Sequence, residues 1–94
     1  MTFDWNESKN QTLKDARGVS FERVVVAVEE GHLLDVLEHP NKTKYSNQLL
    51  LVVEIENYVY LVPTVVDKEV FFLKTIFPSR KYTDKYLPGA RRKS

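Results

Sequence analysis

The chain has 94 residues, 43% of them hydrophobic and 12% aromatic, with no cysteine and a formal net charge of +1. This length predicts one domain with a modest core, and the lack of cysteine excludes a disulfide framework, a cysteine-type zinc site and a thiol nucleophile. There is no run of about 18 apolar residues and no basic-then-apolar leader. We therefore expect a cytoplasmic protein without a membrane span.

Positive charge is concentrated towards the C-terminal end. Residues 1–73 carry seven Lys or Arg and twelve Asp or Glu, a net of −5, whereas residues 74–94 carry seven Lys or Arg and one Asp, a net of +6. A basic cluster of this kind neutralises phosphates and is typical of nucleic-acid binders, although a basic tail also serves solubility. Residues 88–94 are expected to form a flexible basic tail.

The N-terminal third predicts two helices. The first covers residues 6–17, with Asp4 or Asn6 as its cap and Gly18 in the left-handed position that ends it. Its apolar side is thin, which predicts a surface helix. Ser20 caps a second helix, although its valine run favours a strand by propensity. One buried stripe of this helix is expected at Phe21, Val24, Val25 and Val28.

Extended segments rich in Val, Leu, Ile, Tyr and Phe follow the helices. They cover residues 32–38, 48–56, 58–66 and 69–77. The simplest arrangement is an antiparallel meander with the first segment at an edge and the second in the centre. Pro63 predicts a bulge in the third strand or an amide exposed at an edge.

A short third helix capped by Ser79 is expected over residues 79–87. The predicted fold is therefore α+β in a single domain, residues 1–94. It has two N-terminal helices, a four-stranded antiparallel sheet and a short C-terminal helix.

Several standard catalytic motifs are absent. The sequence has no Gly-rich phosphate loop, no G-x-S-x-G elbow and no H-E-x-x-H pair. His32 and His39 flank the first strand and would face opposite sides of it, so they cannot chelate one metal. We expect no metal and no cofactor. His39, which precedes Pro40, is interpreted as a surface or turn residue, with proton exchange as the alternative.

Two sequence blocks resemble a known family. Residues 3–10 read F-D-W-N-x-x-K-N and residues 18–22 read G-V-S-F-E, while residues 79–83 read S-R-K-Y-T, followed by Tyr86. With both blocks in this order, the chain resembles the BrnT-type toxins of bacterial toxin–antitoxin pairs. Between the blocks only the hydrophobic rhythm matches. The resemblance implies a small ribonuclease with a RelE-like fold.

This resemblance also implies where a site would lie. RNA cleavage without a metal requires a base, an acid, and cations around the phosphate that gains charge. The family's Arg-Lys pair falls on Arg80 and Lys81, and its terminal-helix tyrosine falls on Tyr86. Arg80 is the expected phosphate clamp, because a guanidinium binds two phosphate oxygens in a fork. Lys74 is a further cationic candidate, although it stands six residues before the pair where the family commonly has an arginine five before.

The RNA-binding candidates overlap with these residues, and they are Arg80, Lys81, Tyr82 and Lys85. Tyr82 stands where the family commonly has a small residue, and it can stack on an unpaired base or cover the helix stem. The structural alternatives are an ion pair for Arg80 and helix packing for Tyr86. Trp5 is interpreted as a core anchor, and Lys9 and Asn10 suit folding better than catalysis.

Two hypotheses follow. The first is a ribonuclease toxin held inactive by a cognate antitoxin, in the family typically a ribbon-helix-helix protein, whose complex with the toxin binds operator DNA. An acidic or amphipathic antitoxin segment would cover an exposed strand edge and a basic groove. The second hypothesis is a non-catalytic module of the same fold that binds nucleic acid or a partner. The lack of the in-strand arginine and the low histidine content favour the second, and Arg80 with Lys81 favours the first.

Overall fold

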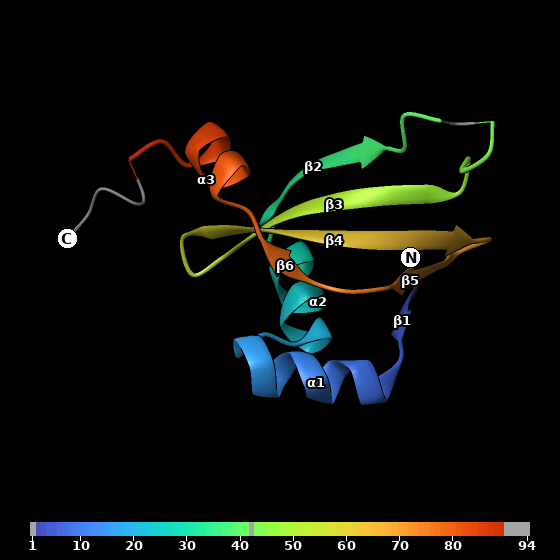
Figure 1. Cartoon of the computed structure of the whole chain (residues 1–94), viewed down its shortest axis with the longest axis horizontal. Coiled ribbons are helices and arrows are strands. Elements are labelled where there is room, and N and C mark those ends of the chain that lie inside the picture. Colours follow the sequence, from blue (N-terminus) through green and yellow to red (C-terminus); the bar gives the residue numbers. More distant parts are fainter. Residues whose placement is uncertain (1, 42, 90–94) are drawn as a thin grey trace.

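The computed structural model describes residues 2–41 and 43–89, so the expected tail lies outside the described residues from position 90 onward. The described part is compact, with a radius of gyration of 13.4 Å, and contains no helix long and apolar enough to cross a membrane. The expected α+β fold is confirmed (Figure 1). In chain order the elements are β1 (Thr2–Trp5), α1 (Glu7–Arg17), α2 (Phe21–Glu29), β2 (Leu33–Glu38), β3 (Gln48–Ile55), β4 (Tyr58–Asp67), β5 (Val70–Leu73), β6 (Phe77–Pro78) and α3 (Arg80–Tyr86).

The sheet is larger than the four strands expected. Its order is β1-β5-β4-β3-β2, with β6 paired to β4, and all neighbours are antiparallel except β1, which runs parallel to β5. The N-terminal aromatic segment supplies the additional strand β1, where the ring of Phe3 lies 5.9 Å from that of Phe71. As expected, β2 lies at an edge and β3 in the interior of the sheet.

The fourth expected segment is divided into β5 and β6, and Pro63 explains why. Pro63 pairs with Leu50 of β3 on one side, and on the other its carbonyl accepts a 2.8 Å hydrogen bond from the Lys74 amide. Proline has no N–H to return that bond. The neighbouring strand leaves β4 at this point, and pairing resumes where Leu61 meets Phe77. The expectation of a bulge or an edge amide is therefore corrected: the proline faces the gap between β5 and β6.

The N-terminal helices begin and end where their caps predict. The side chain of Asn6 accepts from the Lys9 amide at 2.9 Å, and Gly18 adopts a φ of 68° at the end of α1. Ser20 accepts from the Arg23 amide at 3.1 Å and so starts α2. Both helices therefore form from local capping chemistry that the sequence displays.

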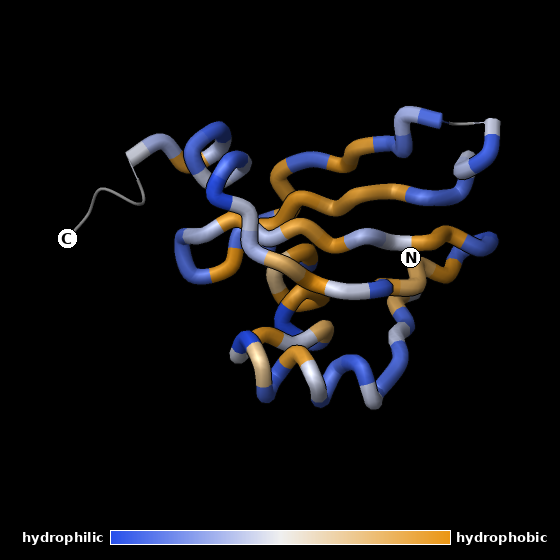
Figure 2. Tube along the Cα trace, in the orientation of Figure 1, coloured by the Kyte–Doolittle hydropathy of each residue, from blue (hydrophilic) through white to orange (hydrophobic). Residues whose placement is uncertain are grey.

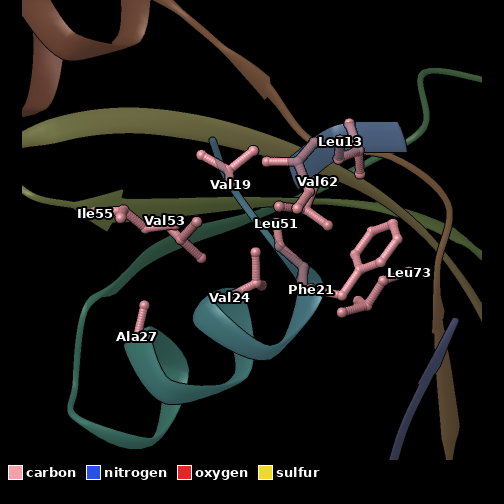
Figure 3. Packing of buried hydrophobic residues seen from close by; sticks show 11 residues of the cluster. Leu13, Val19, Phe21, Val24, Ala27, Leu51, Val53, Ile55, Val62 and Leu73 are labelled. Atoms are coloured by element: carbon pink, nitrogen blue, oxygen red, sulfur yellow. The ribbon is translucent and has the colours of Figure 1, made fainter. Parts of the chain in front are cut away.

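These helices cover one face of the sheet and enclose the larger core with it. Figure 3 shows Phe21, Val24 and Ala27 of α2 pointing towards Leu51 and Val53 of β3. Ala27 is fully buried although it was not among the residues expected there. Trp5 packs on this core through a ring stack with Phe21, centroid to centroid 5.7 Å, as its interpretation as a core anchor predicted.

Asn10 joins α1 to α2. It is fully buried, its amide group donates to Glu22 at 2.8 Å, and its carbonyl oxygen accepts from the backbone N–H of Phe21 at 2.8 Å. The hydrogen bond from Asn10 is the main cause that lowers the pKa of Glu22. This part of the N-terminal block therefore serves folding, as interpreted.

The opposite face of the sheet is covered only in part, by α3. Ser79 caps α3 by accepting from the Tyr82 amide at 3.1 Å. A smaller core forms beneath the helix from Val52, Val59 and Leu61. Figure 2 shows that β3 and β4 are hydrophobic along much of their length, whereas α3 is mostly hydrophilic. One short helix cannot cover this face, and part of it stays open.

Candidate functional site

The partly covered face, called here the α3 face, is organised in rows that cross the strands. Cross-strand partners point to the same side of a sheet. The register gives a first row of Asp35, Val52, Leu61 and Phe77. The second row contains Leu37, Leu50 and Pro63, and Lys74 continues it through its amide bond to Pro63. The third row contains His39, Gln48, Val65 and Phe72.

A groove with a volume of about 310 Å³ lies beside α3 on this face. Its apolar floor comes from the second row, with Leu37, Leu50 and Pro63, and Tyr82 of α3 forms a wall. His39 borders it where β2 ends. Helix α3 is anchored over the first row, where Tyr82 and Tyr86 pack on the smaller core, so the second and third rows remain open beside it.

Tyr82 is flanked by two lysines of its own helix. The Nζ atoms of Lys81 and Lys85 lie 5.7 Å and 5.8 Å from the centroid of its ring. The Tyr86 ring stacks beside it, with centroids 6.0 Å apart. Ammonium groups at these distances are attracted to the ring faces. The structure therefore brings three of the expected RNA-binding residues together, and one of them, Tyr82, lines the groove.

Arg80 is placed differently. It is exposed in the first turn of α3, and residues two positions apart on a helix do not share a side. Tyr82 lines the groove, so Arg80 leaves α3 on a different side from Tyr82. The helix therefore directs the expected phosphate clamp away from the Tyr82 ring.

Lys74 does share the α3 face. Its amide donates to Pro63 in the second row, and its Nζ lies 5.1 Å from the centroid of the Phe72 ring in the third row. The exposed side chain is therefore on the same side of the sheet as the groove floor. This position supports its inclusion among the cationic candidates.

The hydroxyl of Tyr86 is engaged by the edge strand. It donates a 2.6 Å hydrogen bond to Asp35. This bond is the main cause that lowers the pKa of Asp35 and raises the pKa of Tyr86. Tyr86 therefore keeps its proton at neutral pH and ties α3 to β2.

His39 lies just after β2, where the sequence predicted a surface or turn residue, and its position at the groove is what the sequence did not indicate. Its ring lies 4.2 Å from the Tyr45 ring, centroid to centroid, and its Nδ1 accepts from the Asn41 amide at 3.1 Å. In the neutral ring the proton is then on Nε2, which is a donor. Lys44 extends over Tyr45, 5.3 Å from its centroid. The adjacent Lys44 and Tyr45 in this loop were the sequence signal for a second group of one cation and one aromatic ring, next to His39.

The described residues offer no group of three His, Asp or Glu side chains placed to hold a metal ion. His32 is directed to Glu54, with 3.4 Å between its Nδ1 and the nearer carboxylate oxygen, whereas His39 contacts Tyr45.

No family model, no curated protein and no solved structure matches this chain. Its function must therefore be argued from the two sequence blocks and the α3 face. In the second block Ser79 caps α3, and Thr83 is buried with its hydroxyl oxygen accepting from the Val59 amide at 2.9 Å. These residues serve folding, which leaves Arg80, Lys81 and Tyr82 as the residues of this block that are free to act on a ligand.

Proposed function

We propose that this protein is a ribonuclease toxin of a type II toxin–antitoxin pair, as its resemblance to the BrnT-type toxins implies. The observation that carries the proposal is the ring of Tyr82, which lines an open groove and has the ammonium groups of Lys81 and Lys85 5.7 Å and 5.8 Å from its centroid. Aromatic rings stack on unpaired bases, and ammonium groups neutralise phosphates. The arrangement therefore suits single-stranded RNA.

The proposed reaction is metal-independent phosphodiester transfer. The 2′-oxygen of the RNA attacks the neighbouring phosphorus, a 2′,3′-cyclic phosphate forms, and the 5′-oxygen leaves with a proton. Negative charge grows on the phosphate oxygens in the transition state, where fixed cations stabilise it. Lys81 and Lys85 take this role, with Lys74 and Arg80 as further cations, and Tyr86 positions α3 through Asp35.

Two observations favour the second candidate, a module of the same fold that binds nucleic acid or a partner without cleavage. Tyr86 is bonded to Asp35, and Arg80 lies on the flank of α3 away from Tyr82. Both features withdraw an expected catalytic group from the groove. A cleavage assay separates the two candidates.

The proposed partner is a cognate antitoxin, of the ribbon-helix-helix type, and the complex rather than the toxin alone would bind operator DNA. The proposal places both proteins in the cytoplasm. One edge of β2 has no neighbouring strand among the described residues. An acidic or amphipathic antitoxin segment would cover this edge and the lysines of the α3 face.

The test is cleavage of end-labelled single-stranded RNA by the purified full chain in EDTA. We expect cutting that falls about 10- to 100-fold in Lys81→Ala and Lys85→Ala, because each removes a cation from the reacting phosphate. Arg80→Ala should lose less, and Lys9→Ala, on exposed α1, should match the wild type.

Circular dichroism verifies the fold of each variant. RNA binding without cutting by the wild type would support the binding module. Equal cutting by all four variants and the wild type would remove α3 from the site.

A further inference from the structure

We infer that the groove beside α3 receives one unpaired base of the RNA, which stacks on Tyr82 and presents its edge to His39. The inference rests on the proposed RNA substrate and adds a subsite that binds a strand with a base more tightly than an abasic strand. Its elements come from α3, from the second row of the sheet and from the loop after β2.

The size and lining of the groove suit a single base. About 310 Å³ is at the small end of ligand pockets, so an RNA duplex has no room there. Leu50 and Pro63 provide an apolar floor, and the half-buried Tyr82 ring forms an aromatic wall. A planar base fits such a site because its faces are apolar and polarisable, whereas its edge requires hydrogen bonds.

The charges around the groove complement a polyanion. Lys81 and Lys85 lie beside Tyr82 on α3. Lys44 lies over Tyr45 in the loop after β2, and Lys74 lies at the end of the second row. Glu38 is the one acidic residue among the described residues that line the groove. A base in the groove would leave its flanking phosphates at the rim, near these ammonium groups. This charge pattern favours a nucleic-acid strand over an apolar peptide that carries no acidic residue.

His39 gives the site a preference. Its Nδ1 is occupied by the Asn41 amide, so its free ring nitrogen, Nε2, carries a hydrogen and donates. A donor pairs with an acceptor on the edge of a base, such as a uracil carbonyl oxygen or an adenine ring nitrogen, and an abasic position offers neither. A site that hydrogen-bonds a ligand group rejects the analogue that lacks this group.

The experiment uses fluorescein-labelled hexamers with 2′-O-methyl sugars, which the proposed reaction cannot cut. Each hexamer is abasic except at one central position, which carries uracil, adenine or no base. Fluorescence anisotropy with the full chain should show that uracil is bound roughly 5- to 150-fold more tightly than the abasic strand. Adenine, which also presents acceptors and a face that can stack, should likewise bind more tightly than the abasic strand.

Matched variants identify the groove. Tyr82→Leu should abolish the preference for a base, and Tyr82→Phe should retain it because the ring remains. Tyr58→Leu is the control, because Tyr58 contacts Tyr60, which belongs to the core on the opposite face of the sheet. His39→Phe keeps a ring against Tyr45 and should weaken the binding of both bases, because the Nε2 donor is lost.

Equal affinity of the wild type for the uracil and abasic strands, or failure to bind either, would overturn the inference. An unchanged preference for a base in Tyr82→Leu would overturn it as well. A Tyr82→Leu protein that binds RNA as the wild type does but no longer binds the antitoxin would assign the groove to a protein partner. Cleavage of ordinary RNA together with equal affinity for the uracil and abasic strands would keep the ribonuclease and remove the base subsite. Tighter binding of the base-bearing strands without cleavage would keep the base subsite and remove the ribonuclease.

Discussion

The hydroxyl of Tyr86, in the last turn of α3, donates a 2.6 Å hydrogen bond to the carboxylate of Asp35 on the edge strand β2, 51 positions earlier in the chain. A register shift in β2 makes this possible. Leu33 packs on the core beneath α1 and α2, whereas Asp35, two residues later, pairs with Val52 on the α3 face. Without the extra residue, alternation would place Asp35 on the side of Leu33. The bulge therefore decides where α3 is attached.

The first prediction is that this bond stabilises the protein across a defined pH window. The pKa of Asp35 is lowered from its ordinary value of 3.8, and that of Tyr86 is raised from 10.0. A lowered carboxyl pKa stabilises the fold above pH 3.8, and this contribution is lost as the pH falls through the folded-state pKa. A raised phenol pKa stabilises it below pH 10.0, and this contribution is lost as the pH rises through the folded-state pKa.

Thermal unfolding of the wild type and Tyr86→Phe across pH 3 to 11 is the measurement. The melting temperature of the variant should be lower at neutral pH, and the two curves should converge at both extremes. Asp35→Ala alone and together with Tyr86→Phe completes a double-mutant cycle. Additive effects at neutral pH would contradict a direct contact between the two side chains.

The second prediction concerns Thr83, which joins α3 to β4. Its hydroxyl oxygen accepts from the buried Val59 amide at 2.9 Å, and its hydroxyl donates to the Ser79 carbonyl at 2.7 Å. Thr83→Val keeps the shape and leaves the Val59 N–H unpaired, which should lower the free energy of unfolding by about 1 to 3 kcal/mol. Urea denaturation measures this change. Thr12→Val, at an exposed site on α1, should change stability by less than about 0.5 kcal/mol, and equal losses in the two variants would refute the prediction.

The third prediction concerns the buried Asn10. Asn10→Leu leaves the backbone N–H of Phe21 without its 2.8 Å acceptor, which should cost about 1 to 3 kcal/mol of unfolding free energy. Gln11→Ala, on the exposed side of the same helix, is the comparison and should stay near the wild type. Chemical denaturation followed by circular dichroism gives both values, and a stable Asn10→Leu protein would show that α1 and α2 are held together by apolar packing alone.

The stability data separate effects on charge from effects on the fold in the base-subsite and cleavage tests. Lys81, Lys85 and Arg80 are exposed, so substitutions there act on charge with little effect on the fold. Substitutions at Thr83 and Tyr86 act on the attachment of α3. If a substitution at Thr83 or Tyr86 unfolds α3 and abolishes cleavage, that loss does not contradict the proposed role of Lys81 and Lys85.

Local chemistry in the sequence was sufficient for the elements with short-range causes. Asn6, Ser20 and Ser79 each cap the helix predicted to follow, and Gly18 ends the first one, because capping depends on residues within a few positions. Strands β2, β3 and β4 also begin and end close to their predicted positions, since hydrophobic runs between turn residues mark them.

Pairing between distant segments was beyond this reasoning. β1 is four residues long and pairs with β5, almost 70 positions later, and so short a segment carries no period of its own. The break between β5 and β6 arises from Pro63, which belongs to another strand. Both features depend on which backbone groups meet, and that is settled only when the sheet assembles.

The same division applies to the candidate site. The sequence by itself determined that cations are concentrated after residue 73 and that a short capped helix carries most of the described ones, together with Tyr82 and Tyr86. Only the tertiary structure decided that Tyr82, with Lys81 and Lys85 beside it, is turned towards a groove, and that His39 borders that groove. The physical reason is that a helix sets the order of side chains around its own axis, whereas the sheet, through the β2 bulge and the Tyr86–Asp35 bond, sets which side of the helix is turned towards the rest of the protein.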